Sequence, residues 1–589
     1  MQILRINCKN QTYTYGPLPE KFTVIGGRGI IAHILSDEVP ARCNPLGPDN
    51  KLIVCNGPLA GAGVSSAGRL SIGAKSPLTG GIKESNTGGT AAEALAGLGL
   101  RALIFEDQPG RISEASGMQE PEGGAAPGPA AVPMYLLKLD PGSAEFIPAD
   151  EYTGLGNYEV KRRLTERFGE DYATLTIGQA GENRFLNSGI AVSDRDGRPS
   201  RLAARGGLGS VMGGKGIKAV LLKMKGGFRY EHAGSEAFKQ ARSTYHEVVK
   251  TNDRIKVLRE YGTASTVMDA QRLGALPTRN FSSGQFDGVE TLSGEYIHDE
   301  IERRGGEGTN SESCMQICLI QCSNVYPDKQ GKEIVAPLEY ETISLLGSNI
   351  EIGNPDTVAY LNYLCNDYGM DTIETGGALG VMAAAGMLDF GDDQGFIDAV
   401  QKVPEPGSWT GRLVGMGTEN AAKMLGVWRA PVVKGQCMSG YDPRGVKGTG
   451  ITYATTPMGA DHTAGLTIFA PVDHHSKEGQ IDLSRKIQIG RAAYDVFGLC
   501  AFLMAATAMK PELVTDMLNG LYSTEFESSF VAETGKDVIR RELAFNRAAG
   551  FTAADDTVPD FFKQEKLPPF NLEWDITDEE LSSLFGDLR

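Results

Sequence analysis

The sequence predicts an α+β protein whose first part is rich in strands and whose second part is mostly helical. Up to about residue 225, short apolar stretches such as Lys51–Asn56 alternate with glycine-rich loops, as expected for strands joined by tight turns. From about Glu231, apolar residues recur at helical spacing in several long segments, beginning with Ala237–Tyr261. Glycine accounts for 75 of the 589 residues without a repeating period, so we expect many places where the backbone turns tightly or approaches a ligand closely.

The individual elements follow from these patterns. In the first part we expect strands at Met1–Asn7, Lys51–Asn56, Ala102–Phe105 and Lys218–Lys223, with a short helix at Thr90–Leu98. In the second part we expect helices at Ala237–Tyr261, Pro355–Leu364, Ala378–Leu388, Thr410–Leu425 and Ser484–Ala508. The stretch Gln108–Pro133, rich in proline and glycine, is predicted to be a surface excursion. The acidic end, Leu567–Arg589, is predicted to be an extended tail or a short helix.

The composition excludes several classes of protein. Hydrophobic residues make up 41% of the chain and charged residues 22%, which is typical of a globular protein. The net charge of −17 argues against a nucleic-acid-binding surface, because phosphate binding needs clustered lysine and arginine. Met1–Lys9 lacks the basic-then-apolar order of a signal peptide, and without a run of about 18 apolar residues we expect no membrane span. Nine cysteines in a long chain do not suggest a disulfide framework, so we expect a reducing, cytoplasmic location.

Three of the cysteines are regularly spaced. Cys314, Cys318 and Cys322 form a C-x₃-C-x₃-C motif, and three thiolates this close in sequence can converge on one inorganic centre. Zinc usually takes two close pairs of ligands, and the sequence has no second pair. The motif therefore predicts a [4Fe–4S] cluster, with the distant Cys500 as the candidate fourth ligand. The alternative is that these residues are small buried hydrophobes, as free cysteines often are.

Several further motifs accompany the cysteines in a fixed order along the chain. They are Gly26-Gly27-Arg28-Gly29, Gly68-Arg69, Lys75-Ser76-Pro77-Leu78-Thr79-Gly80, Ser85-Asn86-Thr87-Gly88-Gly89, Arg205-Gly206-Gly207, Met212-Gly213-Gly214-Lys215, Glu339-Tyr340-Glu341-Thr342, Asn366-Asp367-Tyr368-Gly369-Met370-Asp371, Gly459-Ala460-Asp461-His462 and Asp495-Val496-Phe497-Gly498-Leu499-Cys500. Each motif alone is weak, but in this order and company they are highly specific. Over nearly its whole length, the chain resembles the tungsten-dependent aldehyde:ferredoxin oxidoreductase family.

The resemblance implies three domains and two redox centres. An N-terminal β-rich domain, residues 1–225, would form a base for the pterins, and two mostly helical domains, residues 226–430 and 431–589, would close over it. The implied cofactors are tungsten (or molybdenum) held by the dithiolenes of two pyranopterins, a nearby [4Fe–4S] cluster, and a Mg²⁺ ion that bridges the pterin phosphates.

The resemblance also assigns residues to these cofactors. Asn86 matches a Mg²⁺ ligand, Arg69 an arginine between the cluster and a pterin, and Arg205 suits the pterin phosphates as a bidentate cation. Successive glycines let backbone N–H groups approach such phosphates. The residues expected to contact the pterins and Mg²⁺ are Arg69, Asn86, Gly88, Gly89, Arg205, Gly206, Gly207, Asn366, Gly369, Asp371, Asp495, Gly498 and Leu499. Those expected to bind the cluster are Cys314, Cys318, Cys322 and Cys500.

Two positions depart from the family pattern. The family's first pterin motif is D-x-x-G-x-D; Gly369 and Asp371 match it, but Asn366 replaces the leading aspartate, so a charge is lost while hydrogen bonding survives. The family's cluster motif is usually C-x₂-C-x₃-C, so Cys314 is offset by one residue. A loop can absorb such an insertion, whereas on a helix it would turn the side chain by about 100°.

Three residues are assigned to catalysis by the same resemblance. Oxidation of an aldehyde to a carboxylic acid adds oxygen from water and removes electrons, so it needs a base and a group that polarises the carbonyl. Glu341 is the expected base, His462 the expected polarising or proton-shuttling group, and Tyr340 would add a hydrogen bond to the substrate. Because the sequence shows no Rossmann fingerprint in the right context, electrons would pass through Arg69 and the cluster to ferredoxin or to separate iron–sulfur and flavin subunits.

Two other functions stay open at this point. Another reaction of the same family, such as low-potential reduction of a thioester-activated aromatic ring, would place a protein thiolate on the metal, and Cys365 or Cys437 would have to supply it. A noncatalytic iron–sulfur relay subunit would lack tungsten, molybdenum and pterin. The sequence does not choose between a homo-oligomer and a hetero-oligomer.

Overall fold

Two six-stranded sheets form the framework of the first part of the chain, which confirms the predicted β-rich region. A computed structural model describes residues 1–110 and 132–589, so most of the predicted surface excursion at Gln108–Pro133 lies outside the described residues. In spatial order, the first sheet contains β2 (Thr12–Pro17), β1 (Gln2–Asn7), β6 (Leu100–Glu106), β3 (Leu52–Asn56), β4 (Leu70–Lys75) and β5 (Ile82–Thr87). The second contains β11 (Arg201–Ala203), β10 (Ile190–Val192), β9 (Tyr172–Thr176), β12 (Ile217–Lys223), β7 (Tyr135–Asp140) and β8 (Ser143–Pro148).

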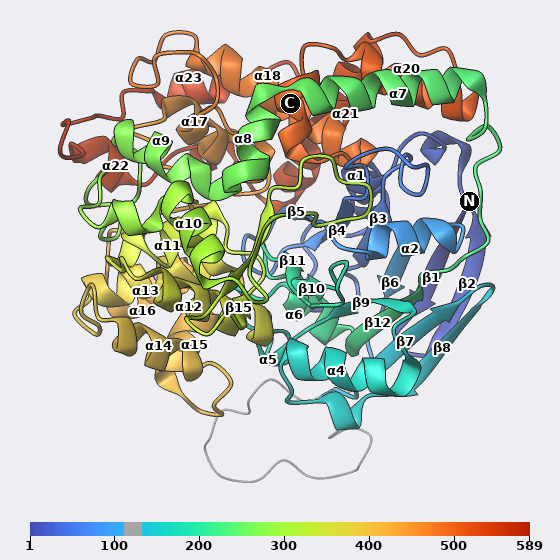
Figure 1. The fold of residues 1–589 in the computed structure, drawn as a ribbon, viewed down its shortest axis with the longest axis horizontal. Coiled ribbons are helices and arrows are strands. Elements are labelled where there is room, and N and C mark those ends of the chain that lie inside the picture. The colour runs from blue at the N-terminus through green and yellow to red at the C-terminus, as the bar shows by residue number, and fades with distance from the viewer. Residues whose placement is uncertain (111–131) are drawn as a thin grey trace.

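Short helices cover these sheets, and longer helices make up most of the remaining chain (Figure 1). Those of the first part are α1 (Gly27–Glu38), α2 (Ala91–Gly97), α4 (Asn157–Phe168), α5 (Gln179–Glu182) and α6 (Leu208–Gly214). Next come α7 (Glu236–Thr251), α8 (Asp253–Tyr261), α9 (Thr266–Arg272), α10 (Gly294–Arg304), α11 (Tyr340–Leu345), α12 (Pro355–Tyr368), α13 (Thr372–Ala384), α14 (Asp393–Gln401), α15 (Trp409–Gly415) and α16 (Gly417–Leu425). The last are α17 (Lys447–Thr455), α18 (Gln480–Phe497), α19 (Met504–Thr507), α20 (Glu512–Tyr522), α21 (Ser529–Ala549), α22 (Asp560–Gln564) and α23 (Asp578–Ser583). The predicted α+β class is therefore confirmed.

Short strands interrupt the helical part at two places. Strands β13 (Thr309–Glu312), β14 (Ser323–Pro327) and β15 (Glu333–Val335) form a small antiparallel sheet. Strands β16 (Val432–Val433) and β17 (Gln436–Cys437) form a two-stranded ribbon. Residues 313–322 connect β13 to β14 without helix, and this connection, called the cysteine loop below, carries the C-x₃-C-x₃-C motif.

Three predicted helices are shorter or broken, each for a local reason. The segment Ala237–Tyr261 divides into α7 and α8 because the side chain of Asn252 caps α8 by accepting a hydrogen bond from the N–H of Ile255. The segment Thr410–Leu425 divides at Gly417, where φ is +82°. The segment Ser484–Ala508 ends its first helix at Phe497, because Gly498 adopts a left-handed conformation and turns the chain. This last break places Cys500 outside any helix.

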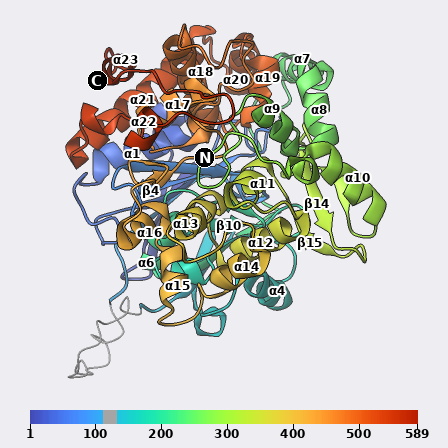
Figure 2. The same ribbon diagram turned by 90° about the vertical axis from the view of Figure 1, so that its left-hand side faces the viewer.

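The two helical parts pack on each other as well as on the sheets. Helix α7 contacts α20 extensively, so a helix from residues 226–430 lies on one from residues 431–589. Figure 2 shows α11 to α16 in front of the sheets and α17 to α23 above them. The predicted boundaries at residues 225 and 430 stay predictions. Among the described residues, no helix is both long and apolar enough to cross a lipid bilayer.

The turn after α18 packs directly against the first sheet. Gly57, which follows β3, is so close to this turn that a β-carbon on it would lie 2.2 Å from the carbonyl oxygen of Phe497 and 2.5 Å from the amide nitrogen of Gly498. Both neighbours are backbone atoms, which cannot rotate away. The absence of a side chain at Gly57 therefore fixes how closely the C-terminal helices approach the sheet.

We expect Gly57→Ala to destabilise the protein by roughly 1–3 kcal/mol, because the added methyl group forces the turn and the sheet apart. Gly234→Ala is the matched control, since a β-carbon there has no heavy atom within 4 Å. The measurement is the midpoint of thermal unfolding at one fixed scan rate. Equal midpoints for the two variants would show that the approach at Gly57 is not a tight constraint.

Candidate functional site

A cavity brings together predicted site residues from all three parts of the chain. Its lining includes side chains from β5, the turn before α6, the first turn of α11, the end of α12 and the segment before α18. The predicted site residues among them are Arg69, Asn86, Arg205, Glu341, Asn366, Asp371 and His462. Residues far apart in sequence thus converge on one space, and that convergence depends on the fold.

Strand pairing accounts for the contact between Arg69 and Asn86. Strands β4 and β5 are antiparallel, with Leu70 opposite Thr87 and Ser71 opposite Asn86. Arg69, immediately before β4, therefore lies beside Asn86, and its Nε donates to Asn86 Oδ1 at 2.8 Å. A second guanidinium nitrogen donates to the Asn86 carbonyl oxygen at 3.1 Å.

Asp495 extends this contact into a buried network of charges. Its carboxylate accepts from Asn86 Nδ2 at 3.0 Å, from Arg491 at 3.1 Å and from Arg28 at 3.3 Å. Arg28 also makes a bidentate pair with Glu542, with both bonds at 2.8 Å. The side chains of Arg28, Asp495 and Glu542 are almost completely buried. Sequence reasoning assigned no role to Arg28 or Arg491, although Arg28 stands in one of the glycine-rich motifs.

A second buried network lies around Arg205. Its Nε donates to Asp371 at 3.3 Å, and another nitrogen donates to the Ala460 carbonyl oxygen at 2.6 Å. Burial opposes the charge on Arg205, but the carboxylates of Asp371 and Asp461 raise its pKa. Asp461 itself pairs with Lys83. Burial raises the pKa of Asp461, but the cations Lys83 and Arg205 lower it and leave it well below the usual range. Sequence reasoning missed the Lys83–Asp461 pair. Asp461 stood out in the sequence only as the residue before His462.

Glu341 and His462 form a carboxylate–imidazole pair at the cavity, and Asp461 Oδ1 lies 3.9 Å from the other ring nitrogen of His462. Glu341 Oε1 lies 3.6 Å from His462 Nε2, and Glu341 Oε2 accepts from the backbone N–H of Gly440 at 2.8 Å. Tyr340 does not line the cavity; its hydroxyl donates to the Gly440 carbonyl oxygen. The expected hydrogen bond from Tyr340 to substrate therefore does not fit its position, and Tyr340 instead steadies the segment that holds Glu341.

The four predicted cluster cysteines come together beside Arg69. The thiol of Cys314 hydrogen-bonds Cys318 and lowers the pKa of Cys318. Burial raises the pKa of Cys322, and the nearby Cys314 and Cys500 raise it further. Burial also raises the pKa of Cys500, whereas Arg69 opposes this shift. Cys314 thus lies with the other three despite its offset in sequence.

The spacing of these sulfur atoms favours a centre with several metal ions. Sulfur ligands about 2.3 Å from one zinc ion can be at most about 4.6 Å apart. Among the described residues, no three of the cysteine sulfurs lie within 4.8 Å of one another. A cluster distributes its thiolates over several irons, so its ligands need not lie that close together.

The conformation of the cysteine loop accommodates the extra residue. Ile317 and Gln321 each precede a cysteine, and each has a positive φ, 53° and 57° respectively. These two left-handed residues reverse the chain after each gap, so successive sulfurs can face the same side. The N–H of Gln321 donates to Cys318 Sγ at 3.5 Å, an amide-to-sulfur contact of the kind found around iron–sulfur sites.

Several predicted cofactor residues lie outside the cavity and have structural positions. A β-carbon on Gly88 would lie 2.9 Å from Cys314 Sγ, and the N–H of Gly89 donates to the Cys314 carbonyl oxygen at 2.8 Å. Both glycines thus border the cysteine loop, and no contact with the cavity is seen. The remaining predicted residues that do not line it are Gly206 and Gly207, which form the turn before α6, Gly369, which caps α12, Asp495, in the last turn of α18, and Gly498 and Leu499, which follow α18.

Unpartnered polar atoms in and beside the cavity suit a polar ligand. Asn366 Nδ2, His462 Nδ1 and Arg491 Nη1 are buried and have no hydrogen-bond partner in the described residues. With Arg69 and Arg205 they form a set rich in donors, as pterin rings and their phosphates require. The residues present therefore fit a pterin cofactor. Neither Cys365 nor Cys437 lines the cavity.

Comparison with known proteins defines the class of this chain. Residues 3–113 and 125–224 match the family model described as aldehyde ferredoxin oxidoreductase, N-terminal domain, and residues 240–583 match the model described as aldehyde ferredoxin oxidoreductase, domains 2 and 3. These matches cover most of the chain, in an order that agrees with its β-rich and helical parts. The chain belongs to the aldehyde ferredoxin oxidoreductase family and is therefore an oxidoreductase.

Individual relatives support this membership. The chain is 28% identical to the tungsten-containing aldehyde ferredoxin oxidoreductase of Pyrococcus horikoshii, over 96% of this chain and 92% of the relative. It is 28% identical to the protein of the same description from Thermococcus kodakarensis, over 92% and 88%. It is 26% identical to the WOR-like subunit of an aliphatic sulfonate oxidoreductase from Pyrococcus furiosus, over 74% and 70%.

One solved structure has a similar fold. It is the active-site complex BamBC of benzoyl coenzyme A reductase with 1,5-dienoyl-CoA, with a TM-score of 0.79 and 17% sequence identity. The match covers all of this chain and 93% of the other chain. At this identity the likeness shows a shared fold.

We expect Asp495→Asn to destabilise the protein by about 3–5 kcal/mol, because it removes the buried negative charge that compensates Arg28 and Arg491. Glu236→Gln is the control, since Glu236 forms an exposed pair with Lys239 that should contribute little. Thermal unfolding of both variants measures the difference. A midpoint for Asp495→Asn equal to that of Glu236→Gln would contradict the central place of Asp495.

Proposed function

We propose that this chain oxidises aldehydes to carboxylic acids, using a tungsten (or molybdenum) bis-pyranopterin and a [4Fe–4S] cluster. The observation that carries the proposal is the Glu341–His462 pair, which opens onto the same cavity as Arg69, Asn86 and Arg205. Family membership and the tungsten-containing relatives support it. When bound, the metal–pterin group would accept the electrons that leave the aldehyde.

Four of the residues that line the cavity would hold the pterins. Arg69 and Arg205 would pair with the phosphates, since buried guanidinium groups bind such anions bidentately. Asp371 and Asn366 would hydrogen-bond a pterin ring. Asn86 would offer its side-chain oxygen to Mg²⁺ in place of the hydrogen bond that it accepts from Arg69.

The chemistry of the substrate would depend on Glu341 and His462. His462 would donate a hydrogen bond to the aldehyde oxygen and so polarise the carbonyl. Glu341 would accept a proton from the water that adds to the carbonyl carbon. Its Oε2 is already held by the N–H of Gly440, which leaves Oε1 facing His462 and the cavity. The carboxylic acid product keeps the oxygen atom of the water. The released protons would pass through Glu341 and His462 to solvent.

Arg69 would connect the cavity with the cluster. It lines the cavity, and it lies near enough to Cys500 and Cys314 to affect the pKa of Cys500. An electron route from the cavity to the four cysteines would therefore pass beside its guanidinium group. Ferredoxin, or separate iron–sulfur and flavin subunits, would take the electrons onward.

Reduction of an aromatic thioester is the second candidate, because the fold is shared with the benzoyl coenzyme A reductase complex. That reaction was expected to need a protein thiolate on the metal. Cys437 Sγ donates to the Met438 carbonyl oxygen at 3.3 Å, and Cys365 is fully buried and does not line the cavity. These positions favour aldehyde oxidation. Metal-edge spectroscopy separates the two, since an extra sulfur ligand beyond the dithiolenes would support the aromatic reaction.

We expect Glu341→Gln and His462→Ala each to lower kcat for aldehyde oxidation by about 10²–10⁴-fold, because each removes a proton-transferring group. Glu260→Gln, an exposed change on α8, should leave kcat unaltered. Aldehyde-dependent reduction of benzyl viologen by metal-loaded protein measures the effect, and metal content confirms loading. Near-normal turnover in both site variants would overturn these assignments.

We expect Cys314→Ser to lose most of its iron, because Cys314 lies with the other three cysteines around one centre. Cys43→Ser is the control, since Cys43 is partly exposed and its neighbour is Lys75, not another cysteine of the motif. Iron content and the visible absorption of the cluster are measured on both. Unchanged iron in Cys314→Ser would show that another residue supplies the first ligand.

A further inference from the structure

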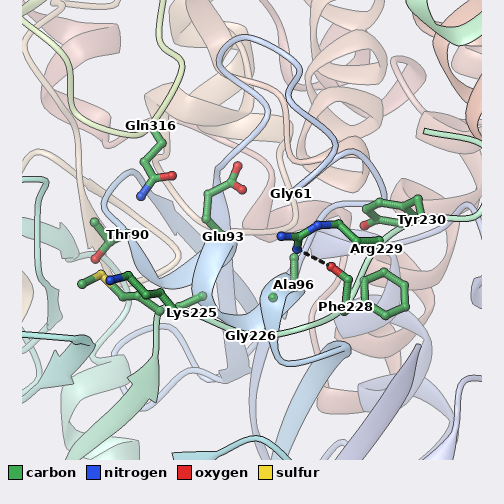
Figure 3. A pocket seen from close by; sticks show the side chains of 13 residues that line it. Gly61, Thr90, Glu93, Ala96, Lys225, Gly226, Phe228, Arg229, Tyr230 and Gln316 are labelled. Carbon is green, nitrogen blue, oxygen red and sulfur yellow. Dashed lines mark hydrogen bonds between the residues drawn. The ribbon is translucent and has the colours of Figure 1, made fainter. Parts of the chain in front are cut away.

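A hollow beside helix α2 borders the cysteine loop and is separate from the cavity. It has a volume of about 200 Å³ and is lined by α2, by the segment that follows β12, and by Gln316 of the cysteine loop. Figure 3 shows the carboxylate of Glu93 near the centre of this hollow, with Gln316 above it and Lys225 and Arg229 below it. Lys225 and Arg229 are exposed, whereas Glu93 is partly buried. The hollow, called the α2 hollow below, therefore connects Glu93 with solvent.

A glycine brings the carboxylate of Glu93 to the edge of the cysteine centre. A β-carbon on Gly68 would lie 3.3 Å from Glu93 Oε1 and 3.4 Å from Met315 Sδ, so both side chains border this glycine. Gly68 immediately precedes Arg69, and Met315, which is completely buried, immediately follows Cys314. The carboxylate thus lies beside the neighbours of a candidate cluster ligand and of the arginine that links the cavity with the cysteines.

The chain that leads into α2 holds Glu93 in this position. The N–H of Gly89 donates to the Cys314 carbonyl oxygen at 2.8 Å. Thr90 then donates through its N–H and its hydroxyl to the Ser193 carbonyl oxygen, at 2.9 Å and 3.0 Å. Glu93 follows in the first turn of α2. Four residues of chain therefore separate Glu93 from a backbone contact with the cysteine loop.

Burial sets the protonation of Glu93. It raises the pKa of this carboxyl to about 7, and the hydrogen bond from the backbone N–H of Gly61 opposes the shift. An ordinary glutamate is ionised at neutral pH, whereas Glu93 changes its charge there. A small change in the electric field around Glu93 is therefore enough to add or remove its proton.

The other titratable groups that line the α2 hollow have partners of their own. Lys225 lies 4.0 Å from Asp171, and the Arg229 guanidinium donates to the Phe228 carbonyl oxygen at 2.7 Å. The Tyr230 hydroxyl donates to a backbone carbonyl oxygen at 2.8 Å, and Glu93 is one of the groups that raise the pKa of Tyr230. None of these groups forms an ion pair with Glu93 in the described part of the chain.

The elements packed around Glu93 add no further charge to the hollow. Strands β3, β6, β9 and β12 pack against α2. Their titratable side chains, all among the described residues, do not line the hollow; they are Cys55, Arg101, Glu106, Tyr172, Lys218 and Lys223. Arg69, next to Gly68, directs its guanidinium to Asn86 at 2.8 Å. Residues 313–322 of the cysteine loop contain no charged side chain apart from the cysteines. The nearest group whose charge can change during turnover is thus the cysteine-bound centre.

We propose that Glu93 is the proton-accepting partner of the cysteine-bound centre, so that reduction of the centre is accompanied by uptake of a proton from solvent through the α2 hollow. The inference rests on the proposed function, in which the four cysteines hold a cluster that carries electrons away from the cavity. One electron makes the centre more negative by one charge, which favours the neutral form of a carboxyl nearby. When the electron leaves, Glu93 returns its proton to solvent, so charge and protons balance over the cycle.

This coupling fixes the direction of the pH effect. The pKa of Glu93 is higher when the centre is reduced than when it is oxidised, because the added electron repels the carboxylate. Between these two pKa values reduction takes up a proton, so the midpoint potential of the centre falls as the pH rises. Below the lower value and above the higher value the potential is constant. Because burial brings the pKa of Glu93 to about 7, the fall begins near neutral pH.

The test measures the midpoint potential of the cluster in the full-length, iron-loaded protein between about pH 6 and about pH 9, by redox titration followed with EPR spectroscopy. Glu93→Gln keeps the size of the side chain and mimics its protonated form. Glu231→Gln is the matched control, because Glu231 is an exposed carboxylate next to Tyr230 at the edge of the α2 hollow. Both variants make the same change in net charge.

We expect the potential of the unaltered protein and of Glu231→Gln to fall as the pH rises above neutral. The potential of Glu93→Gln should be independent of pH and equal to the low-pH potential of the unaltered protein, because glutamine resembles a protonated glutamate. A potential that stays constant with pH in the unaltered protein would overturn the inference. An equal fall in Glu93→Gln and in the unaltered protein would also overturn it.

Infrared difference spectra of the unaltered protein test the same step without a variant. The reduced-minus-oxidised spectrum at about pH 8 should show a gain in carboxylic C=O absorption that shifts in D₂O, and the absence of this gain would contradict proton uptake by a carboxyl. A protein without a reducible cluster at any pH would overturn the proposed function, and this inference with it. A cluster whose potential is indifferent to Glu93 would overturn the inference and leave the proposed function intact.

Discussion

Asp495 is a buried carboxylate on which side chains from both ends of the chain converge. Arg28 reaches it from the first helix, Asn86 from β5, and Arg491 from the preceding turn of α18. Loss of any of its three charged or polar partners would lower the stability of the fold, because the remaining charges would be left uncompensated in a medium of low dielectric. Together with the close approach at Gly57, this group therefore sets the relative position of the first sheet and the C-terminal helices. Cys500 follows five residues later, so the same constraint places the fourth candidate cluster ligand.

The candidate site is a product of that assembly. Arg69 touches Asn86 on one side and lies near Cys500 and Cys314 on the other, so the cavity and the cysteine centre share a residue. Around the cavity, Arg69 and Arg205 are held by neutral or acidic partners that fix their geometry. Such preorganised cations suit phosphates, which would otherwise be expensive to bury. The Glu341–His462 pair faces the same cavity, whose other lining residues would bind the cofactor.

The sequence was sufficient for the fold class and for the identity of most lining residues, because motif order marks them even though they lie far apart. It could not show which glycines serve the cavity. Gly88 and Gly89 look like phosphate-binding backbone in sequence, yet they make room for Cys314, and only three-dimensional proximity reveals this. The helix break at Gly498 was hidden because helical periodicity continues through it. The Lys83–Asp461 pair likewise joins residues that no local pattern connects.

The extra residue before Cys318 shows why spacing alone was ambiguous. On a helix it would have displaced Cys314, but the left-handed Ile317 and Gln321 keep the segment as a loop, and the sulfur returns to the group. The central claim is that this loop and the cavity hold a cluster and a metal–pterin in one chain. Elemental analysis of the native protein tests it most directly. The account predicts about four iron atoms and about one tungsten or molybdenum atom per chain, with pterin in the extract; iron without tungsten, molybdenum or pterin would contradict it and leave an electron-relay subunit.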